Sequence, residues 1–139
     1  MTIKHKILLG YIKDLSVETP DPESLITARE NISKYSLKLD LSSKVLKNKM
    51  VEVYTKLTYE DKINKRKTYF EMIYATVVRI EEERPNPEEL KKFILSDLQT
   101  QIYPAIEKTF VEILKLSGFP DIHLKSKIDF NKLYNEKKN

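Results

Sequence analysis

The sequence predicts an α+β fold, with strands in the first part of the chain and helices in the rest. Apolar residues alternate with a period of two as far as Ile80, and after Asn86 they recur at helical spacing. The segment between these parts, EEERPNP at 81–87, is charged and contains two prolines, which mark a break. With 139 residues, 40% hydrophobic and 33% charged, the chain suits one core, and we expect a single domain over residues 1–139.

Four segments carry the strand pattern. The first, His5–Glu18, stops at the prolines of Thr19–Pro22, because proline donates no hydrogen bond to a sheet. One face of this strand is predicted to be apolar: Ile7, Leu9, Tyr11, Leu15 and Val17. One helical turn is expected around Leu25. The remaining strands are predicted at Tyr35–Leu41, Met50–Tyr59 and Lys67–Ile80.

The last of these strands is apolar on both faces. Phe70 and Met72 lie on one face, while Ile73 and Val77 lie on the other. An antiparallel sheet commonly exposes one face to water. We therefore expect helices to cover one face of the sheet and a partner to cover part of the other.

The helical part has clear start and stop signals. Asn86 is the predicted N-cap, and Pro87 takes the first helical position. Pro104 is expected to kink or restart the helix, and Gly118 is expected to end it. A short last helix is predicted over Phe130–Lys137. The apolar face of the second helix, which belongs either to the core or to an interface between subunits, comprises Ile106, Phe110, Ile113 and Leu114.

No set of residues with catalytic spacing occurs in the sequence. The histidines are His5 and His123, the glycines are Gly10 and Gly118, and there is no cysteine. A glycine-rich phosphate loop and thiol chemistry are therefore excluded, and no serine lies in a nucleophile elbow. We expect a protein that is not an enzyme and that holds no cofactor or metal.

Charge and hydropathy restrict the partners. No stretch approaches the roughly 18 apolar residues of a membrane helix, and the N-terminal apolar run is too short for a secretory signal. These features predict a cytoplasmic chain with no membrane insertion. The net charge of +4 is a mild bias, and the basic segment 62–67, KINKRK, is interpreted as a solvated turn, so no nucleic-acid partner is expected.

Several motifs, taken in order, resemble the SecB family of export chaperones. The family opens its first strand with a pattern very similar to YIKDLSVETP at Tyr11–Pro20, and its second strand looks like Lys38–Leu41. The further motifs are 51–53 and 69–71, which are weaker, and then Pro104, Gly118–Pro120 and Asp129–Tyr134. The ordered set covers nearly the whole chain.

This resemblance implies a four-stranded antiparallel sheet with C-terminal helices packed on one side, assembled as a homotetramer that is a dimer of dimers. It also implies an ATP-independent chaperone. Such a protein holds unfolded preproteins in apolar grooves and delivers them to the SecA translocase. By matching positions, the predicted client-binding residues are Leu39, Leu41, Val53, Tyr54, Phe130 and Leu133, and the predicted SecA-binding residues are Asp14, Glu18, Tyr69 and Glu71.

Alternation agrees with the second set, because Asp14 and Glu18 share one strand face, as do Tyr69 and Glu71. If those strands are neighbours, the four residues form one acidic patch. Many members of the family are acidic and have an acidic tail, whereas this chain is basic and ends in EKKN. Two alternatives therefore stay open: a SecB-like chaperone dedicated to one client such as an antitoxin, and a nucleic-acid-binding adaptor that uses the segment 62–67.

Overall fold

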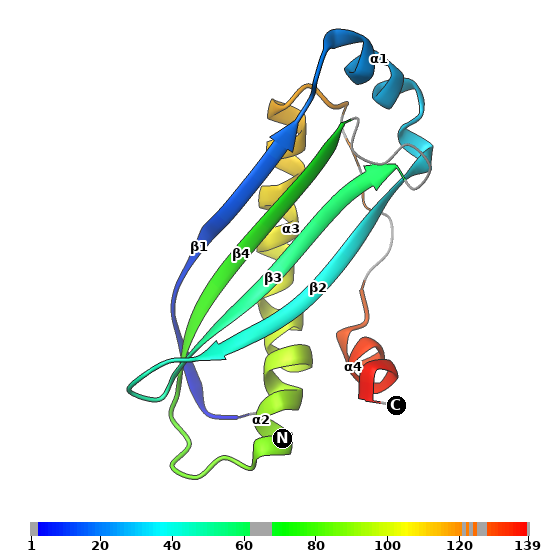
Figure 1. The fold of residues 1–139 in the computed structure, drawn as a ribbon. Helices are drawn as coiled ribbons and strands as arrows, with labels where there is room; N and C mark the ends of the chain where they lie inside the picture. The colour runs from blue at the N-terminus through cyan, green and yellow to red at the C-terminus, as the bar shows by residue number, and fades with distance from the viewer. Residues whose placement is uncertain (1–2, 62–67, 121, 123, 125–127, 139) are drawn as a thin grey trace.

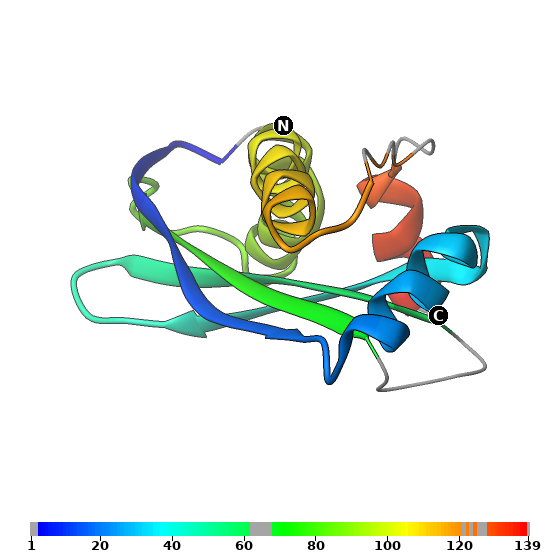
Figure 2. The ribbon, with the colours of Figure 1, turned by 90° about the horizontal axis from the view of Figure 1, so that it is seen from above.

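A four-stranded antiparallel sheet forms one layer of the molecule, and helices cover one of its faces (Figures 1 and 2). The computed structural model describes residues 3–61, 68–120, 122, 124 and 128–138. The α+β fold with C-terminal helices on one side of the sheet, predicted above, is confirmed.

The strands are β1 (His5–Glu18), β2 (Tyr35–Val45), β3 (Met50–Asp61) and β4 (Tyr69–Ile80). Their order across the sheet is β1-β4-β3-β2, so β1 and β2 are the edge strands. β2 continues four residues beyond the predicted end at Leu41, because Ser42–Val45 pair with residues 51–54 of β3 although they lack apolar alternation. Asn48 and Lys49, both at positive φ, close this hairpin, as a tight right-twisted turn requires.

Two irregularities in β1 change which side chains face the helices. The pairing with β4 shifts register between Ile7 and Leu9 and again between Ile12 and Asp14. Each extra residue reverses the alternation. The prediction that Leu9 and Tyr11 share a face with Ile7 and Leu15 is therefore wrong, because they pair with Val77 and Ala75 on the face away from the helices.

Helix α1 (Pro22–Glu30) connects β1 to β2 across one end of the sheet, followed by a single 3-10 turn (Ile32–Lys34). It is longer than the one turn predicted, because Asp21 caps it by accepting a hydrogen bond from the Ser24 amide at 2.7 Å. The C-terminal part contains α2 (Pro87–Lys92), a π-helical segment (Phe93–Asp97), α3 (Leu98–Leu116) and α4 (Phe130–Lys138). The predicted cap is confirmed, since Asn86 accepts from the Glu88 amide at 2.9 Å.

Helix α3 does not restart at Pro104, which lies inside it. Proline inside a helix costs about 3 kcal/mol. Both Pro104 and Thr100, whose carbonyl loses its donor, are exposed, so the carbonyl lies in a part of the helix that water can reach. Buried Tyr103 and Ile106 flank the proline, and burying side chains of this size contributes roughly 1.5–3 kcal/mol each, which offsets the loss.

The core lies between α3 and the two central strands. One cluster joins Leu57, Tyr59, Phe70 and Met72 of the sheet to Tyr103, Ile106, Phe110 and Leu114 of α3. A second cluster joins Val51, Val53, Val78 and Ile80 to Phe93, Ile94 and Leu98. Ile106 and Phe110, left open between core and interface, are therefore core residues of this chain. No helix in the part of the chain that the structure describes is long and apolar enough to span a membrane.

Candidate binding surfaces

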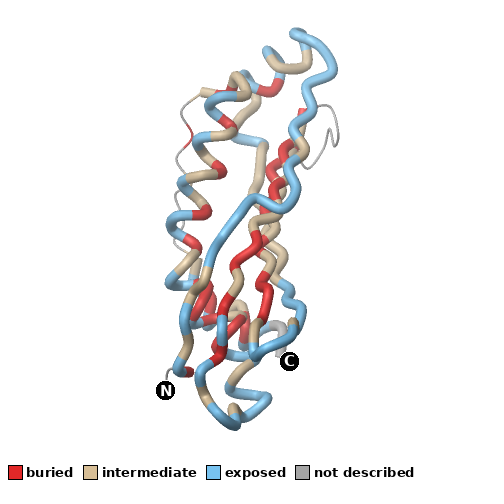
Figure 3. Tube along the Cα trace, turned by 90° about the vertical axis from the view of Figure 1, so that its left-hand side faces the viewer, coloured by how far each residue is buried: buried red, intermediate tan, exposed pale blue. Residues whose placement is uncertain are grey.

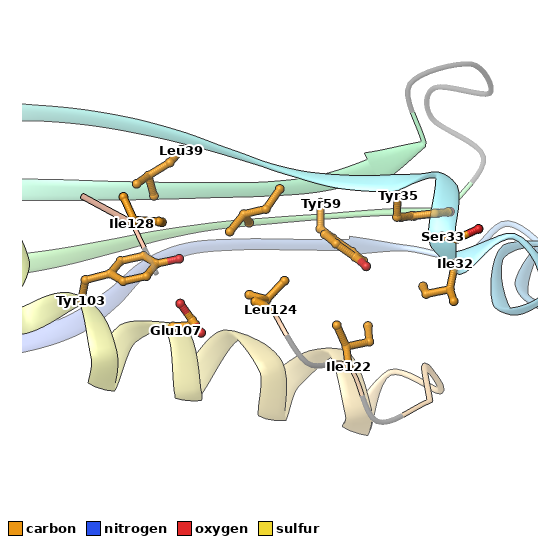
Figure 4. A pocket seen from close by; sticks show the side chains of 11 residues that line it. Ile32, Ser33, Tyr35, Leu39, Tyr59, Tyr103, Glu107, Ile122, Leu124 and Ile128 are labelled. Atoms are coloured by element: carbon orange, nitrogen blue, oxygen red, sulfur yellow. The ribbon is translucent and has the colours of Figure 1, made fainter. Parts of the chain in front are cut away.

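A groove runs along the helix-facing side of β2, and we call it the β2 groove (Figure 4). Its cavity volume is about 550 Å³. The residues that line it are Ile32, Ser33, Tyr35, Leu37, Leu39, Tyr59, Tyr103, Glu107, Ile122, Leu124 and Ile128. Most of these side chains are apolar, and those from β2 are half-buried, so the groove presents apolar surface that this chain covers only in part.

Two local features build the groove. Alternation along β2 directs Tyr35, Leu37 and Leu39 to the same face, toward α3. At the end of α3, Gly118 adopts φ +99, a conformation that favours glycine, and the Phe119 amide donates to the Leu114 carbonyl at 3.1 Å. This turn sends the chain back beside β2, and Ile122, Leu124 and Ile128 form the opposite wall (Figure 4).

Burial raises the pKa of the tyrosines that line the groove. Burial, followed by the charge of Asp61, raises the pKa of Tyr35 to about 12, and its hydroxyl donates to the Thr68 carbonyl at 2.6 Å. Burial also raises the pKa of Tyr59, and it raises that of Tyr103 with a further contribution from Glu107. The groove therefore offers phenol groups, and no phenolate, at neutral pH.

The predicted client-binding residues fall in different environments. Leu39 lines the β2 groove, while Leu41 and Leu133 are half-buried and pack against the same core cluster. Val53 and Phe130 are in the core, with exposed fractions of 0% and 3%. Tyr54 lies on the opposite face of the sheet from Leu39, because it alternates with Val53, which packs under the helices.

Several groove residues were not predicted from the sequence. Tyr103 and Glu107 are four residues apart on α3, a spacing that places both side chains on one face of the helix. Ile122 and Leu124 are apolar residues two positions apart after the glycine turn, and this spacing is the sequence signal that could have pointed to them. No pattern in the sequence indicates that Glu107 faces a groove and not the solvent.

The structure brings the predicted SecA-binding residues together. Strand β1 pairs with β4 so that Glu18 is opposite Tyr69, Ser16 is opposite Glu71, and Asp14 is opposite Ile73. These residues lie on the sheet face away from the helices, and we call Asp14, Glu18, Tyr69 and Glu71 the outer patch. Lys56 of β3 enters this patch, with its Nζ 2.8 Å from Glu71 Oε1. The patch is therefore acidic on the β1 side and partly neutralised on the β3 side.

Beside the outer patch, the Glu52 carboxylate of β3 links β3 to β1 across β4. Glu52 accepts short hydrogen bonds from the hydroxyls of both Tyr11 and Tyr54, and Lys13 Nζ lies 3.5 Å from the same carboxylate. Tyr11 and Tyr54 both pair with Ala75, whose small side chain leaves room for the two rings to converge. Hydrogen bonds, first from Tyr11 and then from Tyr54, lower the pKa of Glu52.

The basic segment 62–67, on which the alternative of a nucleic-acid-binding adaptor depends, lies outside the described residues.

Comparisons with known proteins agree with this fold. A family model described as preprotein translocase subunit SecB matches residues 2–139. A Pelagibacter ubique protein named putative protein-export protein SecB is 41% identical over 140 residues, covering all of both chains. The protein-export protein SecB of Parvibaculum lavamentivorans is 29% identical over 134 residues, which is 95% of this chain and 77% of that one.

A solved structure has the same fold at low sequence identity. It is the SecB-like chaperone of Mycobacterium tuberculosis in complex with a ChAD peptide from the HigA1 antitoxin. The TM-score is 0.68 and the identity is 12%, over 89% of this chain and 88% of that chain.

The Glu52 cluster generates a pH-dependent prediction. Because the pKa of Glu52 is lower in the folded chain than its ordinary value of 4.5, its ionised form stabilises the fold above pH 4.5. This contribution is lost as the pH falls through the folded pKa. We expect Glu52→Gln to unfold at lower urea concentration than the unmodified chain at pH 7, and the difference to shrink below pH 4.5. The measurement is urea unfolding across that pH range.

Glu60→Gln is the matched control, because Glu60 lies on the same strand and the same face without a place in the cluster. We expect little change in stability from it. A pH-independent loss in Glu52→Gln, or an equal loss in Glu60→Gln, contradicts this account of the cluster.

Proposed function

Because the chain belongs to the SecB family of chaperones, we propose that it holds unfolded preproteins for export without ATP and delivers them to the SecA translocase. The β2 groove is the observation that carries this proposal. Unfolded clients expose apolar segments, and covering apolar surface is worth about 25 cal/mol per Å² without reading a precise sequence. Leu37, Leu39 and Leu124 supply such surface. Holding of this kind uses no nucleotide.

Several weak grooves acting on one client explain how such a chaperone holds long chains. Once one segment is bound, neighbouring segments of the same client are at high effective concentration near the other grooves. A dimer of dimers supplies four copies of the β2 groove. Assembly also covers β1, an edge strand whose exposed apolar side chains are Leu9, Tyr11, Ile12, Leu15 and Val17. An uncovered edge of this kind invites aggregation.

The outer patch is the proposed contact for SecA. Asp14 and Glu18 are exposed carboxylates on a basic protein, and they attract a basic partner segment. Lys56 competes for Glu71, so Asp14 and Glu18 carry most of that attraction.

A dedicated chaperone for one client, such as an antitoxin, is the second candidate. The solved SecB-like chaperone that shares this fold is bound to an antitoxin peptide, and Lys56 together with the net charge of +4 weakens attraction for basic partners. Failure to bind SecA, with tight binding to a single client, favours this candidate.

The holding function is tested with a chemically unfolded preprotein diluted into buffer. We expect the chain to suppress light scattering equally with and without ATP. Leu39→Gln with Leu124→Gln removes apolar contacts of the β2 groove and is expected to weaken client binding about tenfold. Val45→Gln is the control, since Val45 is on the same strand, 78% exposed and outside the β2 groove. No suppression at several-fold excess of the chain contradicts the proposal.

The outer patch is tested by reversing two charges. Asp14→Arg with Glu18→Arg is expected to weaken SecA binding at least tenfold and to leave client holding intact, because both side chains are exposed. Glu81→Arg with Glu83→Arg makes the same change in net charge away from the patch, and SecA affinity is expected to persist. Calorimetry or surface plasmon resonance at two salt concentrations gives the affinities. Joint loss of SecA binding and client holding shows that the patch is structural.

The assembly is tested by native mass spectrometry. We expect a species of four times the chain mass of 16.4 kDa. Leu15→Lys with Val17→Lys places charges on the exposed apolar side chains of β1 and is expected to give smaller species. Val45→Lys introduces one such lysine at an exposed position of β2 and is expected to leave the tetramer intact. A monomeric wild-type chain at micromolar concentration contradicts the assembly.

A further inference from the structure

The hairpin between β2 and β3 projects from the end of the sheet opposite α1 (Figures 1 and 2). Figure 2 shows that it extends beyond the helices that cover the sheet. The residues of this projection, which we call the hairpin tip, are Lys44, Val45, Leu46, Lys47, Asn48, Lys49 and Met50. The hairpin tip is therefore in a position to contact a flat surface that approaches this end of the chain.

The lysines of the hairpin tip are not neutralised by nearby carboxylates. Lys44, Lys47 and Lys49 are exposed, and none of them forms an ion pair with a residue that the structure describes. Residues 41–51 contain no Asp or Glu. Glu52, which is opposite Lys44 in the sheet, already accepts the hydrogen bonds of its own cluster. The three ammonium groups are therefore available to an anionic partner.

Two further cations extend this positive surface along the sheet. Arg79 pairs with Met50 on one side and with Lys6 on the other, and both cations are exposed. Glu71 of the outer patch is eight residues from Arg79 on β4, which is roughly 26 Å along a strand. Because salt screens charges beyond about 8 Å, the acidic outer patch does not cancel the positive potential of the hairpin tip.

The hairpin tip also carries apolar surface. Val45 is 78% exposed, and it borders a hollow of about 190 Å³ whose lining includes Met50 and Leu90. Glu82 and Glu83 line the same hollow, so their carboxylates reduce the positive potential there. The exposed cations around the hairpin tip outnumber these two carboxylates, and apolar surface and positive charge therefore occur together.

We propose that the hairpin tip docks on an anionic phospholipid surface. The lysine ammonium groups pair with the headgroup phosphates, and Val45 enters the boundary between headgroups and acyl chains. Attraction of cations to anionic lipids and burial of apolar area add in such a contact. The contact is peripheral and reversible. This inference goes beyond the proposed holding function, which needs no lipid.

A lipid surface explains the hairpin tip better than a soluble polyanion does. Single-stranded nucleic acids stack on aromatic side chains, and residues 41–51 contain none. A phosphate backbone or an acidic peptide supplies negative charge but no broad apolar phase that covers Val45. Docking through the hairpin tip leaves the β2 groove and the outer patch free, because both lie toward the other end of the sheet.

The test is cosedimentation of the full-length chain with vesicles of phosphatidylcholine alone or with one third phosphatidylglycerol. We expect at least tenfold stronger partitioning to the anionic vesicles, weakening as salt is added. The combined variant Lys44→Gln, Lys47→Gln and Lys49→Gln is expected to lower that partitioning at least tenfold, because each cation near the surface contributes.

Two further variants isolate the position of the charge. The combination of Lys34→Gln, Lys108→Gln and Lys132→Gln removes the same charge at exposed positions elsewhere, and partitioning is expected to stay within about twofold of the unmodified chain. Glu82→Gln with Glu83→Gln is expected to strengthen partitioning, and glutamine keeps an oxygen that can accept from the Lys4 amide.

A tryptophan reporter tests whether Val45 itself enters the lipid. The chain contains no tryptophan, so a single introduced one gives an unambiguous signal. The emission of Val45→Trp is expected to shift to shorter wavelength with anionic vesicles only. Leu116→Trp is the control, since Leu116 is 82% exposed at the far end of α3, and its emission is expected not to shift.

The outcomes separate this inference from the proposed function. Equal partitioning to both kinds of vesicle, an equal loss in the two triple-lysine variants, or no emission shift in Val45→Trp overturns the lipid contact and leaves the holding function standing. Lysine-dependent binding to an oligonucleotide or to polyglutamate, without that emission shift, assigns the hairpin tip to a soluble polyanion and also overturns it. Suppression of client aggregation by the variant of Lys44, Lys47 and Lys49 is expected to match the unmodified chain.

Discussion

One helix is narrower than a four-stranded sheet, and this difference determines which strands of the sheet are covered. A helix with its side chains is roughly 10–12 Å across, and neighbouring strands are about 4.8 Å apart. A single helix therefore covers about two strands, and α3 covers β3 and β4, whose inward side chains are almost all buried. β1 and β2 extend beyond its cover, and Figure 3 shows long exposed stretches of chain beside the buried central strands. The apolar residues of both edge strands remain at least partly exposed.

The two edge strands, β1 and β2, have different surroundings. At β2, the chain returns after Gly118, and Ile122, Leu124 and Ile128 stand opposite the strand, so the uncovered surface becomes a groove. At β1, the described residues provide no such wall, and Leu9 and Leu15 are 52% and 42% exposed. A groove with two walls fits a narrow, extended polypeptide, whereas an exposed edge strand fits the broad surface of another folded subunit. The proposed division between client binding at β2 and assembly at β1 follows from this difference.

Local signals in the sequence predicted most of the fold. The bounds of β1, the Asn86 cap and the Gly118 stop are each set by residues within a few positions, and all three are confirmed. The two shifts of register in β1 depend on its pairing with β4, which no local pattern encodes. Pro104 does not restart the helix, because burial of side chains on both sides of it outweighs one lost hydrogen bond.

The candidate surfaces were harder to predict from the sequence, because they too depend on tertiary contacts. Alternation tells which face a side chain takes but not whether a helix covers that face, so Val53 and Leu39 looked equivalent although one is core and the other lines the groove. Lys56 and Glu107 gave no signal, since exposed charges are common on any strand or helix. Their meaning depends on what lies across the sheet or across the groove, and that is set by the tertiary fold.

A groove that stays partly open also limits how stable the chain can be. Apolar side chains such as Leu37 and Leu39, half-buried in this chain, forgo part of the free energy that full burial would provide. The groove is continuous with the core, because Tyr59 and Tyr103 line the groove and belong to the same buried cluster as Leu57, Met72 and Phe110. The residues of that cluster under α3 are fully buried, so the stability lost at the groove is confined to the side chains along β2 and the segment opposite it.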